Sequence, residues 1–151
     1  MKVYRLSNSE FAGDLEGTGA KLYGGRWNNK GTACIYTSAS RALSVLELAA
    51  NVETEFLPAN LSITSYEFPD SEIRNLSEKE LPENWTEIPG PSSTKDLGSK
   101  LLLNPNVLCI RVPSIMVEQE YNYLINPESN RINSVHIIEI TKFQFDNRIK
   151  K

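Results

Sequence analysis

Residues 23–47 place the strongest constraint on how this chain can fold. A glycine-rich turn, a short strand-like segment and a helix-like segment follow one another there without a spacer. Gly24 and Gly25 let the backbone turn sharply or approach a ligand closely. Arg26 follows at once, and Trp27 beside it can pack beneath the turn. The fold must therefore accommodate a rigid turn that presents a guanidinium group at a fixed place.

A strand and then a helix are predicted after this turn. Residues 32–36 are rich in residues that favour β-structure. Ser38 or Ser40 can cap the helix that follows, and the helix is expected to end near Asn51. Its apolar residues recur at helical spacing: Ala42, Leu43, Val45, Leu46, Ala49 and Ala50.

Glu47 interrupts the apolar face of this predicted helix. It lies four residues after Leu43 and three before Ala50, so its carboxylate shares their face. An unpaired charge in apolar surroundings is costly in free energy. Glu47 is therefore expected to be either paired with polar groups or functional.

The composition is typical of an ordinary globular protein. The chain has 151 residues, of which 40% are hydrophobic and 23% charged, and a single domain over residues 1–151 is expected. Sixteen basic and 19 acidic side chains give a net charge of −3. Because general nucleic-acid and anionic-membrane binders carry a basic excess, the charge argues against both classes. A small anionic ligand held by a few arginines remains compatible with it.

No transmembrane run and no signal peptide are predicted. Cys34 and Cys109 lie in apolar, strand-like segments and are expected to be reduced core residues of a cytoplasmic protein. These cysteines and the single histidine, His136, lack the spacing of metal ligands, so no metal site is expected. His136 opens an apolar strand and is interpreted as structural.

The rest of the chain predicts strands and helices in mixed order. Residues 92–103 form a second helix candidate, and residues 72–91, with three prolines and many charges, are interpreted as a surface excursion. Regular strand–helix alternation is absent, which favours an α+β fold over a doubly wound sheet. The further strand-like segments are 2–6, 61–68, 107–112, 121–127 and 135–145.

Gly98 lies in the middle of the second helix candidate. A glycine there costs about 1 kcal/mol relative to alanine. Close approach of another segment to the helix explains such a glycine more readily than ordinary packing does.

The residues alone leave the chemistry open. The chain lacks GxGxxG after a strand and lacks GxxxxGK[ST], and its single histidine lies in a strand, which argues against a Ser-His-Asp arrangement. Arg5 is either an edge-strand residue, the better interpretation on its own, or reaches into a site. Each polar candidate is either part of a shared site or has an ordinary structural role: a salt bridge for Arg5 and Arg26, core packing for Tyr36, a helix surface for Glu47 and a turn for Ser114.

Several short motifs are spread over nearly the whole chain: Tyr4-Arg5, Gly25-Arg26-Trp27-Asn28 with Gly31, Ile35-Tyr36-Thr37-Ser38 with Glu47, Asp96-Leu97-Gly98, Val112-Pro113-Ser114 and Tyr121-Asn122-Tyr123-Leu124-Ile125-Asn126-Pro127. In these motifs and in their order the chain resembles the RES domain, which is named for an arginine, a glutamate and a serine. Ser99 departs from the family pattern, in which an acidic residue is expected.

This resemblance implies a fold similar to the ADP-ribosyltransferases, with a mixed, split β-sheet core and flanking helices. It implies the toxin of a bacterial toxin–antitoxin pair, neutralised by an Xre-type helix-turn-helix antitoxin. Members of the family consume NAD as a substrate, by phosphorolysis with inorganic phosphate or by hydrolysis, or transfer ADP-ribose to a protein. No further cofactor is implied.

The same resemblance gives the candidate residues roles in cleaving the nicotinamide–ribose bond. Such cleavage passes through an oxocarbenium-like state, and Glu47 would stabilise it through the ribose 2-hydroxyl. Arg5 and Arg26 would hold the pyrophosphate, or one of them an incoming phosphate. Tyr36 would offer its ring to nicotinamide, and Ser114 a hydrogen bond to ribose or phosphate.

One leading function and two alternatives follow. The leading function is a toxin that degrades NAD, the first alternative is an ADP-ribosyltransferase that modifies a protein, and the second is a catalytically silent binding module. The sequence leaves open whether the chain forms a homodimer. The assigned residues are Glu47, Arg26 and Ser114 for catalysis and Arg5, Gly25, Arg26, Tyr36 and Ser114 for NAD binding.

Overall fold

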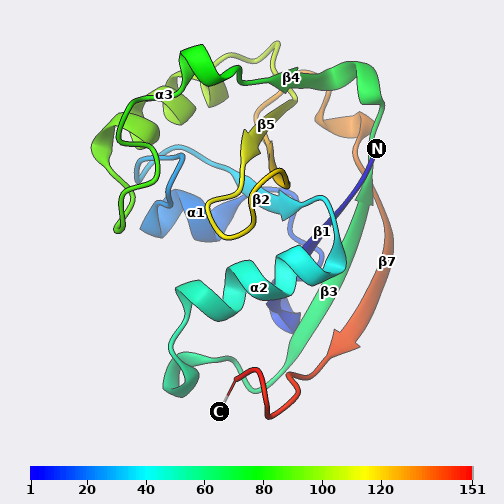
Figure 1. The fold of residues 1–151 in the computed structure, drawn as a ribbon. Helices are drawn as coiled ribbons and strands as arrows, with labels where there is room; N and C mark the ends of the chain where they lie inside the picture. The colour runs from blue at the N-terminus through cyan, green and yellow to red at the C-terminus, as the bar shows by residue number, and fades with distance from the viewer. Residues whose placement is uncertain (151) are drawn as a thin grey trace.

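The computed structural model describes residues 1–150, and this part of the chain folds as one mixed sheet flanked by helices (Figure 1). Its α-helices are α1 (Thr18–Tyr23), α2 (Arg41–Asn51) and α3 (Ser92–Leu102). Its strands are β1 (Lys2–Asn8), β2 (Ile35–Ser38), β3 (Leu61–Glu67), β4 (Ile73–Asn75), β5 (Cys109–Pro113), β6 (Tyr121–Ile125) and β7 (His136–Phe143).

The sheet is split between β1 and β2. Its strand order is β4-β5-β6-β2-β1-β3-β7, and only the β4–β5 pair is parallel within the described residues. β1 pairs with β3 along its whole length, whereas it pairs with β2 only where Tyr4 faces Ser38. The two halves of the sheet therefore part beyond this single residue pair, which confirms the predicted α+β fold with a split sheet.

Helix α2 packs on the half of the split sheet that contains β1 and β3. Its Val45 and Leu48 pack against a buried cluster of Leu6, Leu61 and Ile63. Figure 1 shows the helix lying against β1. The predicted apolar face was thus only partly right: Leu43 is buried and Val45 packs on the sheet, as predicted, whereas three other predicted residues are exposed, namely Ala42, Leu46 and Ala50.

Ser40, and not Ser38, caps α2. The Ser40 hydroxyl accepts a hydrogen bond from the Leu43 backbone N–H at 3.0 Å. Ser38 is instead the last residue of β2. That strand begins later than predicted because the Thr32 carbonyl accepts from the Asn28 side chain at 2.9 Å and does not join the sheet.

The segment interpreted as a surface excursion, residues 72–91, contains a strand that the sequence analysis missed. Ile73–Asn75 forms β4 and pairs with β5 at the edge of the sheet. Leu76 and Trp85 then join a buried cluster. The interpretation of this segment as surface alone was therefore wrong. The strand was missed because three residues are too few for a periodic pattern to be recognised.

Both cysteines belong to the core, as predicted. Cys34 and Cys109 are buried and free, and burial raises the pKa of each thiol far above its ordinary value. Both groups therefore stay protonated and unreactive. His136 opens β7, and its side chain is exposed.

Helix α3 lies directly against the arginine-bearing turn. A Cβ atom added at Gly98 would lie 1.8 Å from the Trp27 carbonyl oxygen, which confirms the prediction of close approach. On either side of it, the Thr94 hydroxyl donates to the Arg26 carbonyl at 2.6 Å and the Ser99 hydroxyl accepts from the Asn29 N–H at 2.8 Å. The helix thus fixes the turn at successive backbone positions.

We expect Gly98→Ala to destabilise the protein, because the methyl group would collide with the Trp27 backbone. Overpacking of this kind lowers the free energy of unfolding by about 1–3 kcal/mol or more. The control is Gly19→Ala in α1, where a Cβ meets nothing within 4 Å. Thermal unfolding should give a lower Tm for Gly98→Ala than for Gly19→Ala, and equal values would contradict the close contact.

Candidate functional site

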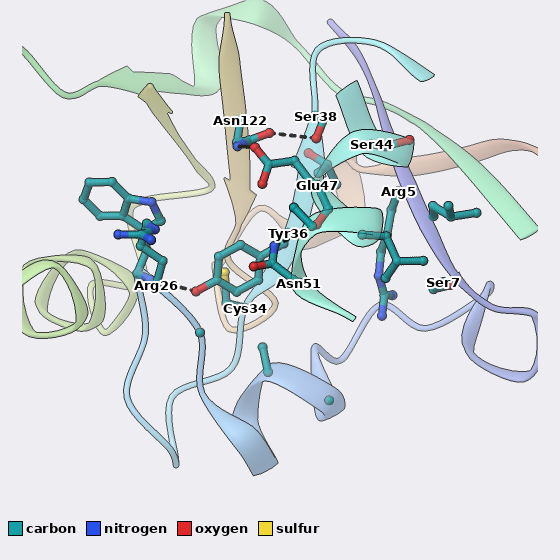
Figure 2. Close-up of a pocket in the computed structure, with 18 of the residues that line it drawn as sticks. Arg5, Ser7, Arg26, Cys34, Tyr36, Ser38, Ser44, Glu47, Asn51 and Asn122 are labelled. Atoms are coloured by element: carbon teal, nitrogen blue, oxygen red, sulfur yellow. Dashed lines mark hydrogen bonds between the residues drawn. The ribbon is translucent and has the colours of Figure 1, made fainter. Parts of the chain in front are cut away.

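A pocket of about 820 Å³ opens where the sheet splits (Figure 2). Its walls come from β1, β2, α2, the glycine-rich turn and residues 88–90. Five of the six assigned residues line it: Arg5, Gly25, Arg26, Tyr36 and Glu47.

Glu47 is held in one orientation by two hydrogen bonds. Its Oε1 atom accepts from the Asn122 side-chain amide at 2.7 Å and from the Ser114 hydroxyl at 2.9 Å. Asn122 is itself fixed, because the Ser38 hydroxyl donates to its Oδ1 atom at 2.7 Å (Figure 2). Glu47 is therefore both paired and part of the pocket wall, and its Oε2 atom has no partner within residues 1–150.

Ser114 contacts Glu47 and is buried next to the pocket. Its hydroxyl donates to Glu47 and accepts from the backbone N–H groups of Met116 and Val117 at 3.0 and 3.3 Å. It is 5% exposed and does not line the pocket wall. This position suits a residue that orients Glu47, and it differs from the expected contact with ribose or phosphate.

Tyr36 is fixed by its hydroxyl, which leaves its ring to form the pocket wall. The hydroxyl donates to Asn28 Oδ1 at 2.6 Å and accepts from the Trp27 N–H at 3.0 Å. A Cβ at Gly25 would lie 2.6 Å from this oxygen, so only glycine fits beside it. Burial raises the pKa of Tyr36 well above its ordinary value, and the hydroxyl is therefore neutral.

Arg26 connects the turn to the segment 72–91. Its Nη1 atom donates to the carbonyl oxygens of Trp85 and Glu87, at 2.9 and 2.8 Å. Burial lowers the pKa of Arg26, and the Glu47 carboxylate opposes this shift. The arginine thus holds residues 88–90 against the pocket while its remaining nitrogens stay available to a ligand.

Arg5 lies on a central strand, so the edge-strand interpretation was wrong. β1 is flanked by β2 and β3, and Arg5 Nη1 is buried without a hydrogen-bond partner in the described residues. Figure 2 places Arg5 and Arg26 on opposite sides of Tyr36, with Glu47 between them. A ligand that touched both arginines would have to extend across the Tyr36 ring.

Sequence reasoning missed the polar residues that support the site. Asn28 is fully buried, and its amide donates to the carbonyl oxygens of Ala20 and Thr32. Asn122 and Ser38 orient Glu47. The signal for Ser38 and Asn122 was a polar residue inside a strand, where an unsatisfied polar group is costly. Asn28 lies in a polar turn and gave no such signal.

Two negative findings apply to residues 1–150. None of the helices there has the length and apolar character needed to cross a bilayer. No group of three or more histidine, cysteine, aspartate or glutamate side chains is arranged to bind a metal ion.

The fold and pocket define an α+β protein with a carboxylate and two arginines in a split sheet, and comparison with known proteins places it in a family. The RES domain matches residues 2–146. A protein named Toxin Res from Yersinia enterocolitica is 34% identical over 152 residues, which is 99% of this chain and all of that protein. The chain therefore belongs to the RES domain family of toxins.

Two further comparisons, one of sequence and one of structure, also find proteins described as toxins or as parts of a toxin-antitoxin complex. A protein named Prs ADP-ribosylating toxin, from a Sphingobium species, is 33% identical over 141 residues, or 91% of this chain and 88% of that protein. A chain of the M. tuberculosis MbcT-MbcA toxin-antitoxin complex superimposes with a TM-score of 0.75 at 16% identity, covering 94% of this chain and 83% of that chain. The predicted likeness to the ADP-ribosyltransferase fold is thereby confirmed.

We expect Tyr36→Phe to lower the free energy of unfolding by about 1–3 kcal/mol, because it leaves the Trp27 N–H and Asn28 Oδ1 without their partner. Tyr23→Phe is the matched control, since Tyr23 is 79% exposed and the change should cost less than about 0.5 kcal/mol. Urea denaturation of both variants measures the difference. Equal stabilities would mean that the Tyr36 hydroxyl does not hold the turn.

Proposed function

We propose that this toxin degrades NAD by cleaving the bond between nicotinamide and ribose, with inorganic phosphate or water as the acceptor. The observation that carries the proposal is the orientation of Glu47 by Asn122 and Ser114 inside a pocket that also contains arginines. Glu47 would act in catalysis, Arg26 would bind and stabilise phosphate charge, and Ser114 would position Glu47.

The chemistry follows from the free oxygen of Glu47. Cleavage develops positive charge on the ribose, as in glycoside hydrolysis. A fixed carboxylate near that charge, bonded to the 2-hydroxyl, strengthens its interaction as the transition state forms. Because Asn122 and Ser114 occupy only Oε1, Oε2 is available for this contact.

The remaining walls suit the other parts of NAD. The pocket volume of about 820 Å³ lies within the range of small-molecule sites. The neutral Tyr36 ring offers an apolar face for the flat nicotinamide. Gly25 lets the Tyr36 hydroxyl lie close against the turn that lines the pocket. Arg5 and Arg26 provide positive charge on either side of the ring for phosphate groups.

Transfer of ADP-ribose to a protein is the second candidate function. The name of the Sphingobium relative, an ADP-ribosylating toxin, favours it. Both functions cleave the same bond and differ in the acceptor. Product analysis after incubation with NAD, with and without phosphate and with cell extract, separates them, because phosphorolysis needs phosphate and protein modification labels a protein.

A catalytically silent binding module fits the site less well. Such a module needs no carboxylate fixed by two donors, and placing one in a half-buried position costs free energy. The orientation of Glu47 is thus better explained by catalysis.

An antitoxin partner of the Xre helix-turn-helix type and a cytoplasmic location complete the proposal. The structural neighbour comes from a toxin-antitoxin complex, which supports an antitoxin partner. A cytoplasmic enzyme that drains NAD would harm its own cell unless an inhibitor were made with it. Exposed apolar residues at the pocket offer contacts for a partner: Phe11, Tyr23, Ile88 and Met116.

We expect Glu47→Gln to reduce NAD turnover by at least about 10²-fold, because it removes the negative charge and keeps the shape of the side chain. Glutamine can still accept from Asn122 and Ser114, so the Tm should change little. The control is Glu53→Gln, an exposed residue after α2. A Glu47→Gln variant with the turnover of the unmodified protein would overturn the proposal.

We expect Arg26→Lys to weaken NAD binding or turnover by at least about tenfold. Lysine keeps the charge but loses the planar fork that can contact phosphate while bonding to Trp85 and Glu87. Arg148→Lys, at a side chain that is 90% exposed, controls for the exchange itself. Kinetics and calorimetry on both variants measure the effect, and an unchanged Arg26→Lys variant would leave Arg26 a purely structural role.

A further inference from the structure

The pocket gathers positive charge in a protein that is negative as a whole. Its charged wall residues are Arg5, Arg26, Lys95 and Glu47, three cations against one carboxylate, whereas the chain carries a net charge of −3. Two of the three cations are accounted for above. Lys95 has no role in the chemistry described so far.

Lys95 belongs to the Arg26 end of the pocket. It is the fourth residue of α3 and directly follows Thr94, whose hydroxyl donates to the Arg26 carbonyl at 2.6 Å. Gly90, which also lines the pocket, packs against the Arg26 Cα atom. Arg5 lies on the far side of Tyr36 (Figure 2), so Lys95 is the cation that can contact the same phosphate groups as Arg26.

The Lys95 ammonium has no partner in the described residues. It is half-buried and takes part in none of the salt bridges within residues 1–150. The adjacent carboxylate of Asp96 accepts from the Asn29 side-chain amide at 2.9 Å. Lys95 can therefore direct its full charge at a ligand.

Helix stability does not explain Lys95. A cation near the N-terminus of a helix faces the positive end of the helix dipole, which is unfavourable. No acidic residue lies in the first turn of α3 to compensate. The favourable place for a lysine is the last turn, where Lys100 is found.

We propose that Lys95 is a substrate-binding residue that holds the pyrophosphate of NAD together with Arg26. The pyrophosphate carries two negative charges, and Arg26 already uses one nitrogen for the carbonyl oxygens of Trp85 and Glu87. A second cation on the same side of the pocket balances the part of the pyrophosphate charge that Arg26 does not neutralise. This inference rests on the proposed function, since it names a contact of the same substrate.

The test is calorimetric binding of ADP-ribose, which has the pyrophosphate, and of nicotinamide riboside, which lacks it. Lys95→Gln should weaken ADP-ribose binding by at least about tenfold and leave nicotinamide riboside binding unchanged. Lys95→Arg should retain most of the affinity. Lys100→Gln, which removes the same charge from the exposed end of α3, should behave like the unmodified protein toward both ligands.

The Tm of Lys95→Gln separates a binding role from a structural role. If Lys95 stabilised the fold, its removal would lower the Tm. Because Lys95 opposes the helix dipole, Lys95→Gln should keep or raise the Tm. A lower Tm, or equal weakening of both ligands, would overturn the role in pyrophosphate binding. Equal ADP-ribose affinity in Lys95→Gln and the unmodified protein would overturn this inference alone, whereas absence of ADP-ribose and NAD binding to the unmodified protein would overturn the proposed function and this inference together.

Discussion

The single residue pair between β1 and β2 is the constraint on which the rest of the structure depends. Because these central strands meet only at Tyr4 and Ser38, the sheet parts and leaves room for a pocket between its halves. Ser38 also begins the chain of hydrogen bonds that reaches Glu47 through Asn122. Ser38, which joins the two halves of the sheet, is thus linked by hydrogen bonds to Glu47, which lines the pocket.

The pocket combines rigid backbone with polar groups that are already paired. Helix α3 fixes the arginine-bearing turn through Thr94, Gly98 and Ser99, and the Tyr36 hydroxyl fixes it from the other side. Such preorganisation means that little has to move when a charged substrate binds. The same contacts make the turn sensitive to small changes, since a single methyl group at Gly98 would displace it.

The sequence predicted what is local and missed what is distant. The α2 helix, its serine cap and the tight contact at Gly98 could be predicted because each depends on spacing or on the special properties of glycine. The bond from Asn122 to Glu47 joins residues 75 positions apart, and Arg26 bonds to backbone carbonyls about 60 positions away. Every residue has a backbone carbonyl acceptor, so no pattern in the sequence could have identified the Trp85 and Glu87 carbonyls as the partners of Arg26. The position of Ser114, buried beside Glu47, likewise depends on the pairing of β5 with β6.

The central claim is that a carboxylate held in the split sheet serves to break the nicotinamide–ribose bond. The most direct measurement is the amount of free nicotinamide that the purified protein releases from NAD, followed by chromatography over time. The account predicts that nicotinamide appears in equal amount to the NAD lost, with the pyrophosphate of the other product intact. Cleavage at the pyrophosphate, or NAD that stays whole in the presence of phosphate, water and cell protein, would contradict it.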